Sequence, residues 1–264
     1  MDLALQDKVG IVTGSGWGIG KAVAVGLAAE GAKVVIADLD EVRGAAAAEE
    51  INANGGTALF VKTDVTSWEN VEQLAATTME TFGQIDIMVN NAGAWTLDLF
   101  ARIPREKWAI DIGVNYYGTL NTCKAVIDHM IERKSGCIIN VGSDAGRVGE
   151  PNQPVYSGAK AAVIGFTRAL AKDVGRHGIR VNAVCPSMTS GERRAELEAD
   201  MKENKPEEYA AYEETMKKII RLYPLRKLGK PEDLANTIVF LSSDLRAGHI
   251  TGQTLSVNGG YCML

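Results

Sequence analysis

The stretch Thr13-Gly14-Ser15-Gly16-Trp17-Gly18-Ile19-Gly20 follows a short β-branched run and opens a segment with helical periodicity. Glycines allow positive φ and a close approach to a pyrophosphate, and the N-terminus of the following helix offers free N–H groups and a partial positive charge. The stretch therefore predicts a phosphate-binding turn, formed by Gly14, Ser15, Trp17, Gly18 and Ile19. Because the glycine spacing is not that of G-x-G-x-x-G, a tight turn without a ligand stays the alternative.

On either side of this turn, β-branched runs alternate with helical patterns along the whole chain. The runs cover residues 9–13, 33–37, 58–62, 85–90, 137–141, 179–184 and 254–257. This alternation is typical of an α/β fold with a doubly wound parallel sheet, here of about seven strands with helices on both faces. No interior linker or repeat interrupts it, so we expect residues 1–264 to form a single domain.

Two local patterns predict how the helices begin and pack. Ile19, Val23 and Leu27 recur at a spacing that gives the first helix an apolar face toward the sheet. Thr66, followed by Glu69, predicts a capping box that opens the helix after the third strand.

Residues 190–223 differ in composition from the rest of the chain. They are rich in Glu, Lys, Arg and Ala, and two helical patterns meet around Lys205-Pro206. The segment follows the sixth strand, at the edge of the sheet where ligands bind in such folds. We therefore expect a lid that closes over a substrate, with a solvated pair of surface helices as the alternative.

The bulk composition excludes several classes of function. A net charge of -5 without a long basic run argues against a nucleic-acid partner and favours a small metabolite. Met1 to Lys8 has no apolar run typical of a secretory signal, and no stretch of roughly 18 apolar residues is present to span a membrane. We expect a cytoplasmic protein without a membrane partner.

The cysteines and histidines are scattered along the chain. They are Cys123, Cys137, Cys185 and Cys262, and His129, His177 and His249. Without a C-x-x-C pair or a metal-ligand spacing, the thiols are expected to be free and buried, and no metal site is predicted.

Asp38 lies at the end of the second predicted strand. A carboxylate there can accept hydrogen bonds from the adenosine ribose hydroxyls of a dinucleotide, and it would repel a 2′-phosphate. Trp17 beside the glycines and Leu39 after Asp38 supply no cation for NADP, so the expected cofactor is NAD. Asp64 and the Val65 backbone are candidate adenine contacts, with a turn role for Asp64 as the alternative.

Tyr156 and Lys160 are spaced so that they lie on one face of a helix. An adjacent ammonium and a bound nicotinamide cation would favour the phenolate of Tyr156. Ser143, at the end of the fifth strand, could hold a substrate oxygen while Tyr156 transfers its proton. The pattern predicts hydride transfer between a carbon atom and nicotinamide.

With these motifs in place, the chain resembles the short-chain dehydrogenase/reductase family over nearly its whole length. The matching pieces are Thr13 to Gly20, Asp64-Val65, Asn90-Asn91-Ala92-Gly93, Asn115, Ser143, Tyr156 with Lys160, Asn182, Pro186, and Thr251-Gly252-Gln253 to Gly259-Gly260. The resemblance implies a Rossmann-like fold, a homotetramer, and NAD-dependent interconversion of a secondary alcohol and a ketone.

The resemblance also implies roles for individual residues. Asn115, Ser143, Tyr156 and Lys160 would form a catalytic tetrad, in which Asn115 holds a water of the proton relay and Lys160 binds the nicotinamide ribose. The remaining cofactor contacts would be Asn91, Ala92, Gly93, Pro186, Met188 and Thr189. Two positions depart from the family pattern: Gly142 replaces a serine or alanine, and Ser187 replaces a glycine.

Asp144, Arg147 and Trp95 are the expected substrate contacts. The charged run after Ser143 is similar to that of members acting on alicyclic β-hydroxyacyl-CoA thioesters, and Arg147 with Arg193 or Arg194 could meet the CoA phosphates. The alternative is that Asp144 and Arg147 pair with each other at the surface. Trp95, Leu97 and Met188 suggest an apolar or aromatic wall, although each could belong to the core.

Three other functions fit the sequence less well than an alcohol dehydrogenase. A catalytically silent NAD-binding regulatory or partner subunit would be expected to lack one of the four tetrad residues, all of which are present. By the family comparison, an enoyl reductase would have a longer spacing between Tyr and Lys, and a sugar epimerase a longer chain.

Overall fold

A seven-stranded parallel sheet forms the centre of the computed structural model, which describes residues 2–263. The strands are β1 (Val9–Thr13), β2 (Lys33–Asp38), β3 (Thr57–Lys62), β4 (Ile87–Asn90), β5 (Gly136–Val141), β6 (Ile179–Pro186) and β7 (Thr254–Val257). Their order is β3-β2-β1-β4-β5-β6-β7, and every neighbouring pair is parallel. The predicted doubly wound α/β fold is confirmed. Its strand order reverses between β1 and β4, which is where such sheets bind ligands.

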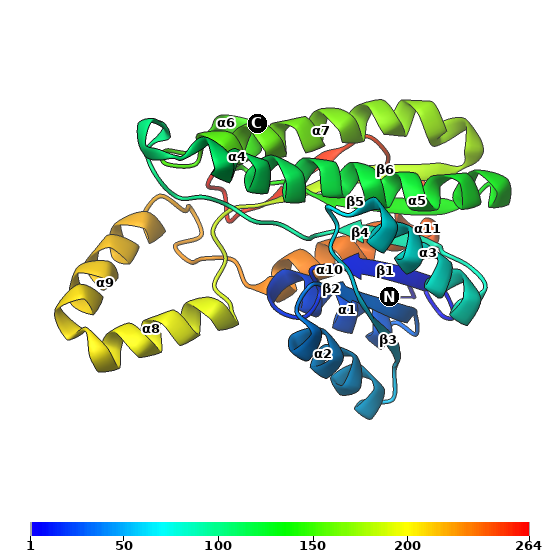
Figure 1. Cartoon of the computed structure of the whole chain (residues 1–264), viewed down its shortest axis with the longest axis horizontal. Helices are drawn as coiled ribbons and strands as arrows, with labels where there is room; N and C mark the ends of the chain where they lie inside the picture. Colours follow the sequence, from blue (N-terminus) through cyan, green and yellow to red (C-terminus); the bar gives the residue numbers. More distant parts are fainter. Residues whose placement is uncertain (1, 264) are drawn as a thin grey trace.

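Helices cover both faces of the sheet (Figure 1). They are α1 (Gly18–Ala29), α2 (Glu41–Ala53), α3 (Trp68–Phe82), α4 (Arg105–Ile112), α5 (Gly118–Arg133), α6 (Ala145–Val148), α7 (Pro154–Val174), α8 (Glu192–Asn204), α9 (Pro206–Ile220), α10 (Pro231–Ser242) and α11 (Asp244–Ala247). Short turns of other helix types are η1 (Phe100–Arg102), η2 (Gly113–Tyr117) and η3 (Gly175–His177). Of these, η2 is a π-helix between α4 and α5.

Alternating side chains of the strands supply two separate apolar cores. In β1, Val12 joins the core under α1, α2 and α10, whereas the adjacent Ile11 joins the core under α3, α5 and α7. The same alternation separates Ile36 from Val35 in β2. A strand buried on both faces in this way reads as a continuous apolar run, which explains why the strands were visible in the sequence.

The predicted cap of α3 is wrong by one residue. Ser67, not Thr66, is the N-cap, and its hydroxyl accepts a hydrogen bond from the Asn70 amide. The Thr66 hydroxyl instead donates to the Asp64 carboxylate at 2.7 Å. Because Asp64 engages Thr66 in the turn, the helix begins one residue later than the capping pattern suggested.

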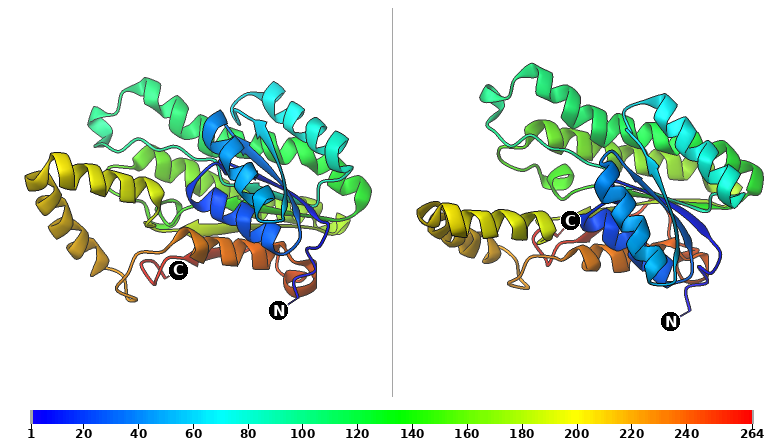
Figure 2. Two further views of the ribbon diagram at one scale, coloured as in Figure 1. Left: turned by 90° about the horizontal axis from the view of Figure 1, so that it is seen from below. Right: turned by 60° about the horizontal axis from the view of Figure 1, so that its bottom comes forward.

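Residues 190–223 contain the two expected helices, α8 and α9, which project from the sheet as an arm (Figures 1 and 2). The arm joins the body through the Ser190 amide, which donates to Gly229 O at 2.8 Å, and through the Thr189–Gly229 bridge. Within the described part of the two helices, only Met216 is buried. The helix boundary at Lys205-Pro206 is confirmed.

No helix within residues 2–263 is long and apolar enough to cross a membrane. The four cysteines are free and buried, as predicted.

Candidate active site

The glycine turn between β1 and α1 has the shape of an anion cradle. Gly14 and Gly18 adopt positive φ, of 61° and 59°. A Cβ on Gly20 would lie 2.2 Å from Gly14 O, so only glycine lets the helix start this close to the turn. A Cβ on Gly18 would meet nothing within 4 Å, so this side of the turn opens toward free space where a phosphate can approach.

Residues predicted to touch the cofactor also hold this turn in place. The Asn91 side chain donates to Thr13 O at 3.0 Å and to Gly14 O at 2.9 Å. The amides of Asn91 and Ala92 both donate to the Thr13 hydroxyl. The Ser15 hydroxyl donates to Val12 O at 2.6 Å. The side chains of Ser15 and Asn91 therefore fix the turn through backbone oxygens.

Asp38 closes β2 beside the turn, with a side chain only 7% exposed. Its Oδ2 atom accepts a hydrogen bond from the Gly16 amide at 2.7 Å, and its Oδ1 atom accepts one from the Asp40 amide at 2.9 Å. These bonds fix the carboxylate where the predicted adenosine ribose would lie. Leu39, by contrast, is exposed.

Trp17 and Leu39 supply no cation, as predicted, but a cation from α2 lies beside the turn. The Arg43 guanidinium lies 5.2 Å from the centre of the Trp17 ring and 3.7 Å from an Asp40 carboxylate oxygen. Arg43 is on the first turn of α2, and its position beside Gly16 depends on the fold rather than on adjacency in the sequence. A cavity of about 170 Å³ lies here, lined by Gly16, Trp17, Lys21, Arg43, Ala46, Ala47, Glu192 and Glu196.

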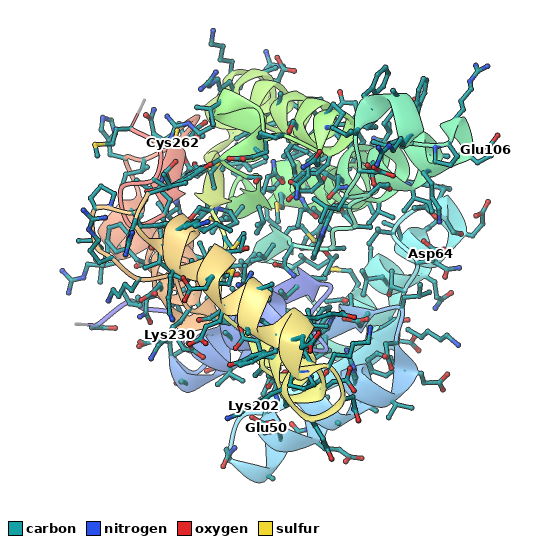
Figure 3. The ribbon with its side chains drawn as sticks, turned by 90° about the vertical axis from the view of Figure 1, so that its left-hand side faces the viewer. Glu50, Asp64, Glu106, Lys202, Lys230 and Cys262 are labelled. Atoms are coloured by element: carbon teal, nitrogen blue, oxygen red, sulfur yellow. The ribbon has the colours of Figure 1, made fainter. Side chains whose placement is uncertain are left out.

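Asp64 and Val65 lie at the turn after β3. The Asp64 carboxylate accepts hydrogen bonds from the Thr66 amide and hydroxyl, and the Asp64 amide donates to Asn70. Val65 is buried against Gly118 at the start of α5, and its carbonyl accepts a hydrogen bond from Asn121. The turn role of Asp64 is therefore present in the structure. Figure 3 shows Asp64 at the periphery of the molecule, away from the arm.

Tyr156 and Lys160 lie on successive turns of α7, as the spacing predicted, and Pro154 occupies its N-terminal turn. The Lys160 Nζ atom lies 5.8 Å from the centre of the Tyr156 ring and donates to Val141 O at 2.7 Å. Ser143 follows β5 and forms a hydrogen bond with Tyr156. The fold thus brings Ser143, Tyr156 and Lys160 together at the carboxyl end of β5.

Burial dominates the acidity of this cluster. It raises the pKa of Tyr156 to about 12, and the hydrogen bond with Ser143 only partly offsets it. It lowers the pKa of Lys160 to about 8. The expected lowering of the Tyr156 pKa by the Lys160 ammonium is therefore not present in the protein alone. A cationic nicotinamide would be the additional charge that favours the phenolate.

Asn115 lies in the π-helix η2, and its position there aims the amide into the protein. The Nδ2 atom donates to Ala94 O at 2.6 Å and to Asp111 O at 2.7 Å. A Cβ on Gly93 would lie 3.1 Å from Asn115 Oδ1 and 3.9 Å from Lys160 Nζ. Gly93 therefore leaves a small space that the amide and the ammonium both border, so all four tetrad residues converge.

The segment after β6 is held by contacts with three other parts of the chain. The Met188 amide donates to the Tyr223 hydroxyl at 3.2 Å, and Pro186 O accepts from the Asp144 amide. Thr189 is paired with Gly229. The strand extends to Pro186, two residues beyond the predicted end, which carries this segment up to the open edge of the sheet.

The two departures from the family pattern have local explanations. A Cβ on Gly142 would lie 2.7 Å from Cys185 Sγ, so the thiol of β6 occupies the space that a serine or alanine would need. The Ser187 hydroxyl is directed at Asn258 O, at 3.5 Å. Both positions are therefore matched to neighbouring residues of this chain.

Asp144 does not lie at the surface. It is buried, and its carboxylate accepts hydrogen bonds from the Ser256 hydroxyl at 2.6 Å and from the Asn258 amide. Arg147 donates to the same Ser256 hydroxyl and lowers the pKa of Asp144, although burial raises that pKa overall. Both carboxylate oxygens are thus engaged by Ser256 in β7 and by Asn258 directly after it, and the substrate contact of Asp144 stays a prediction. The surface location in the alternative is wrong because Asp144 is buried, whereas the Arg147 charge does act on its carboxylate.

The arginines considered for CoA phosphates are engaged within the protein. Arg147 binds Ser256, and the Arg194 guanidinium donates to the Tyr212 hydroxyl and to Met216 Sδ, both at 3.2 Å. The Arg193 side chain lies outside the described part of the structure. Arg147 and Arg194 are thus both engaged by other groups of the protein, and their contact with CoA phosphates stays a prediction.

Large apolar side chains are exposed on the loops after β4, β5 and β6. Trp95 is 50% exposed, and its ring meets the Tyr156 ring edge-on at 6.4 Å between centroids. The other exposed members are Leu97, Leu99, Phe100, Val148, Met188 and Leu222. Trp95, Leu97 and Met188 are thus not core residues, and the alternative raised for them is wrong.

One buried charged residue near the site was not anticipated from the sequence. Asp111 is a fully buried carboxylate in the last turn of α4, immediately before the π-helix that carries Asn115. Among the described residues of α4, Asp111 alone is buried, so the local sequence gave no signal of its burial.

Comparison with known proteins gives concordant matches. Residues 14–262 match the family model described as enoyl-(acyl carrier protein) reductase. The chain is 42% identical to a 3-oxoacyl-[acyl-carrier-protein] reductase of Synechocystis sp., over 98% of this chain and 99% of the relative. It is 38% identical to the (2S)-[(R)-hydroxy(phenyl)methyl]succinyl-CoA dehydrogenase subunit BbsD of Thauera aromatica, over 98% of each chain. It is 35% identical to the 3-oxoacyl-[acyl-carrier-protein] reductase FabG of Thermotoga maritima, over 98% of this chain and 99% of that relative.

Proposed function

The chain belongs to the short-chain dehydrogenase/reductase family, and we propose that it interconverts a secondary alcohol and a ketone, with Tyr156 as the acid/base and NAD as the cofactor. One observation carries this proposal: Tyr156, Ser143 and Lys160 meet at the carboxyl end of β5, beside the space bordered by Asn115. The oxidoreductase class follows from the family, whereas the acid/base role and the cofactor are the proposal.

Ser143, Tyr156 and Lys160 have different roles in the proposed reaction. When bound, the nicotinamide cofactor supplies or accepts a hydride at the reacting carbon. The Ser143 hydroxyl holds the substrate oxygen by a hydrogen bond, and the Tyr156 phenol gives that oxygen its proton in reduction or takes it in oxidation. The Lys160 ammonium and the oxidised nicotinamide together would favour the phenolate when the cofactor is bound, since the protein alone leaves the pKa of Tyr156 raised.

The glycine turn fits a dinucleotide. The open side of Gly18 and the N-terminus of α1 suit a pyrophosphate, and the buried Asp38 carboxylate has lone pairs left for two ribose hydroxyls. The same carboxylate repels a 2′-phosphate, which favours NAD. The Arg43 guanidinium could bind a 2′-phosphate and so favour NADP. However, Asp40 and the Trp17 ring already contact this guanidinium.

Two single variants separate NAD from NADP. We expect Asp38→Ala to lower kcat/KM for NADH by about tenfold, since ribose hydrogen bonds to a charged group are lost, and to raise it for NADPH. Arg43→Ala should leave kcat/KM for NADH within about twofold, because a mostly exposed ion pair contributes little. A wild-type enzyme that prefers NADPH, and loses that preference in Arg43→Ala, would show that Arg43 binds a 2′-phosphate.

For the substrate we propose a β-hydroxyacyl or β-ketoacyl thioester with an apolar or ring-bearing acyl chain. Two of the relatives are named as reductases of 3-oxoacyl groups on acyl carrier protein. A third is named as a dehydrogenase of a phenyl-bearing hydroxyacyl-CoA. The exposed Trp95 beside Tyr156 and the apolar side chains on the surrounding loops suit such an acyl chain. The Tyr-to-Lys spacing favours this reaction over the enoyl reduction in the description of the family model.

The test is a panel of substrates with NADH and NADPH, followed by the absorbance of the reduced nicotinamide. Acetoacetyl-CoA and a β-keto-β-phenylpropionyl thioester represent small and ring-bearing acyl groups, and simple secondary alcohols with NAD are the comparison. Turnover that depends on Tyr156 supports the proposal. Cofactor binding without turnover of any ketone or alcohol would instead support the silent binding subunit.

The remaining parts of the proposal concern larger features. Residues 190–223 act as the lid of a single domain, since the arm follows β6 and is linked to α1 by Lys21, which lies 3.7 Å from Glu192. A cytoplasmic homotetramer follows the family pattern, and light scattering after size exclusion tests the oligomeric state.

A further inference from the structure

The cavity of about 170 Å³ beside the glycine turn is lined from two sides. Gly16, Trp17 and Arg43 belong to the turn and to α2, whereas Glu192 and Glu196 come from α8 of the arm. Figure 1 shows the start of α8 near α1, with its later turns projecting away from the body. The arm therefore brings carboxylates to the edge of the proposed cofactor site.

This cavity lies next to the carboxylate that is proposed to bind the adenosine ribose. The Gly16 amide donates to Asp38 Oδ2 at 2.7 Å. A Cβ on Gly16 would lie 3.1 Å from the same oxygen and 3.1 Å from the Arg43 Cβ atom, so both side chains flank Gly16. Since the ribose hydroxyls are proposed to bind Asp38, a phosphate on the 2′ oxygen would border this cavity.

The two cations of the cavity are already paired with carboxylates. The Lys21 Nζ atom lies 2.9 Å from a Glu50 carboxylate oxygen and 3.7 Å from one of Glu192. The Arg43 guanidinium lies 3.7 Å from an Asp40 oxygen. The hydrogen bond with Glu50 raises the pKa of Lys21, and the charge of Glu192 adds to this effect. The charge of the arm is therefore felt at α1.

Glu196 adds a second carboxylate of the arm to the same cavity. It stands one helical turn after Glu192, so the two side chains lie on the same face of α8, and both line the cavity. With Asp38 beside Gly16, a 2′-phosphate would meet carboxylates from the body and from the arm.

We propose that Glu192 and Glu196 are specificity-determining residues, which keep a 2′-phosphate out of this cavity and so favour NAD over NADP. This inference rests on the proposed function and extends cofactor selection from Asp38 to the arm. Arg43 is a cation that a 2′-phosphate could use, and the carboxylates of α8 offset its attraction. The ribose of NAD carries neutral hydroxyls at this place and is not repelled.

The test compares the Kd of NADPH with that of NADH, which fluorescence titration of the bound nicotinamide measures without any turnover. In Glu192→Gln/Glu196→Gln, we expect the ratio of the two Kd values, NADPH over NADH, to fall by about tenfold, since one exposed charge interaction contributes up to about fivefold. The fall should shrink in about 0.5 M NaCl because salt screens exposed charges. Repulsion of the pyrophosphate is common to both dinucleotides and cancels in the ratio.

Three further variants separate charge from the placement of the arm. Glu203→Gln makes the same change of charge on an exposed side chain at the other end of α8, and should leave the ratio within about twofold. Lys21→Gln removes the ion pair between α1 and the arm but keeps both carboxylates, so the ratio should not fall. Addition of Arg43→Ala to the double variant should remove most of the gain, because the phosphate then loses a cation.

Other outcomes overturn the inference. An unchanged ratio in the double variant would do so, and so would an equal fall in Lys21→Gln, which assigns selection to the position of the arm rather than to its charge. Tighter binding of NADPH than of NADH by the wild-type protein would also overturn it. Because only binding is measured, a protein that turns over no ketone would contradict the proposed function, while the ratio would still decide this inference.

Discussion

The floor of the site, formed by Ser143, Lys160, Asn115 and Tyr156, and the arm of α8 and α9 are held in place by different contacts. In the floor, Ser143, Lys160 and Asn115 are buried, and backbone oxygens of neighbouring elements fix the lysine and the asparagine. In the arm, Met216 is the only buried side chain described within α8 and α9. Chemistry that depends on sub-ångström placement therefore lies on rigid elements, whereas the part that covers substrate can change at little cost in stability.

The largest effect should come from the floor. We expect Tyr156→Phe to lower turnover by about 10³-fold, since a general acid/base contributes about 10²–10⁴-fold, while NADH affinity stays within about threefold. Steady-state kinetics and fluorescence titration with NADH measure the two quantities. Tyr117→Phe, on an exposed tyrosine, is the control. Near wild-type turnover in Tyr156→Phe would show that Tyr156 is not the acid/base group and that the floor does not carry the chemistry.

The pH dependence tests the two shifted groups of the floor. With the pKa of Tyr156 raised to about 12, the phenol needed for reduction is protonated at neutral pH. With the pKa of Lys160 lowered to about 8, its charge is lost as pH rises through that value. The rate of ketone reduction should therefore be flat below about pH 8 and fall severalfold above it. Lys160→Arg, whose side chain stays charged, should lose this fall; a fall that persists assigns it to another group.

A smaller effect is expected from packing under Ser143. Gly142→Ala places a methyl group against Cys185 Sγ, and overpacking of this kind costs about 1–3 kcal/mol in unfolding free energy. The double variant with Cys185→Ala should recover most of this loss, because it removes the sulfur. Urea unfolding of wild type, the two single variants and the double variant gives the coupling free energy between Gly142 and Cys185. Additive losses would show that the two residues do not compete for space.

The smallest effect should come from the arm. Arg194→Ala removes the contacts of α8 with Tyr212 and Met216 in α9. We expect Tm to change by no more than about 2 °C, since two partly buried contacts within a lightly packed arm contribute little, and KM for the thioester to rise about threefold with kcat unchanged. Calorimetry and steady-state kinetics check both values. A Tm loss as large as that of Gly142→Ala would show that the arm is as tightly packed as the floor.

Much of the fold was predictable because the central strands are buried on both faces and therefore appear as uninterrupted apolar runs. The meeting of Ser143, Tyr156 and Lys160 was predictable from spacing, since Tyr156 and Lys160 share one helix and Ser143 follows a strand at the same edge. The position of Asn115 was implied only by the family resemblance. The positions of Arg43 and Asp111 were not predictable, because they depend on how α2 and α4 pack. The burial of Asp144 was also hidden, since its partners Ser256 and Asn258 lie near the other end of the chain.

The contacts of Asp144 hold the segment after Ser143 against the loop after β7, which is far away in the sequence. Asn258 binds both the Asp144 carboxylate and Cys262 O, and the Tyr261 hydroxyl lies 2.6 Å from the Glu150 carboxylate. The final loop therefore clamps the segment that begins at Ser143. Removal of residues beyond Val257, or a bulky fusion placed there, should loosen the serine that holds the substrate oxygen, even though the sheet itself would stay intact.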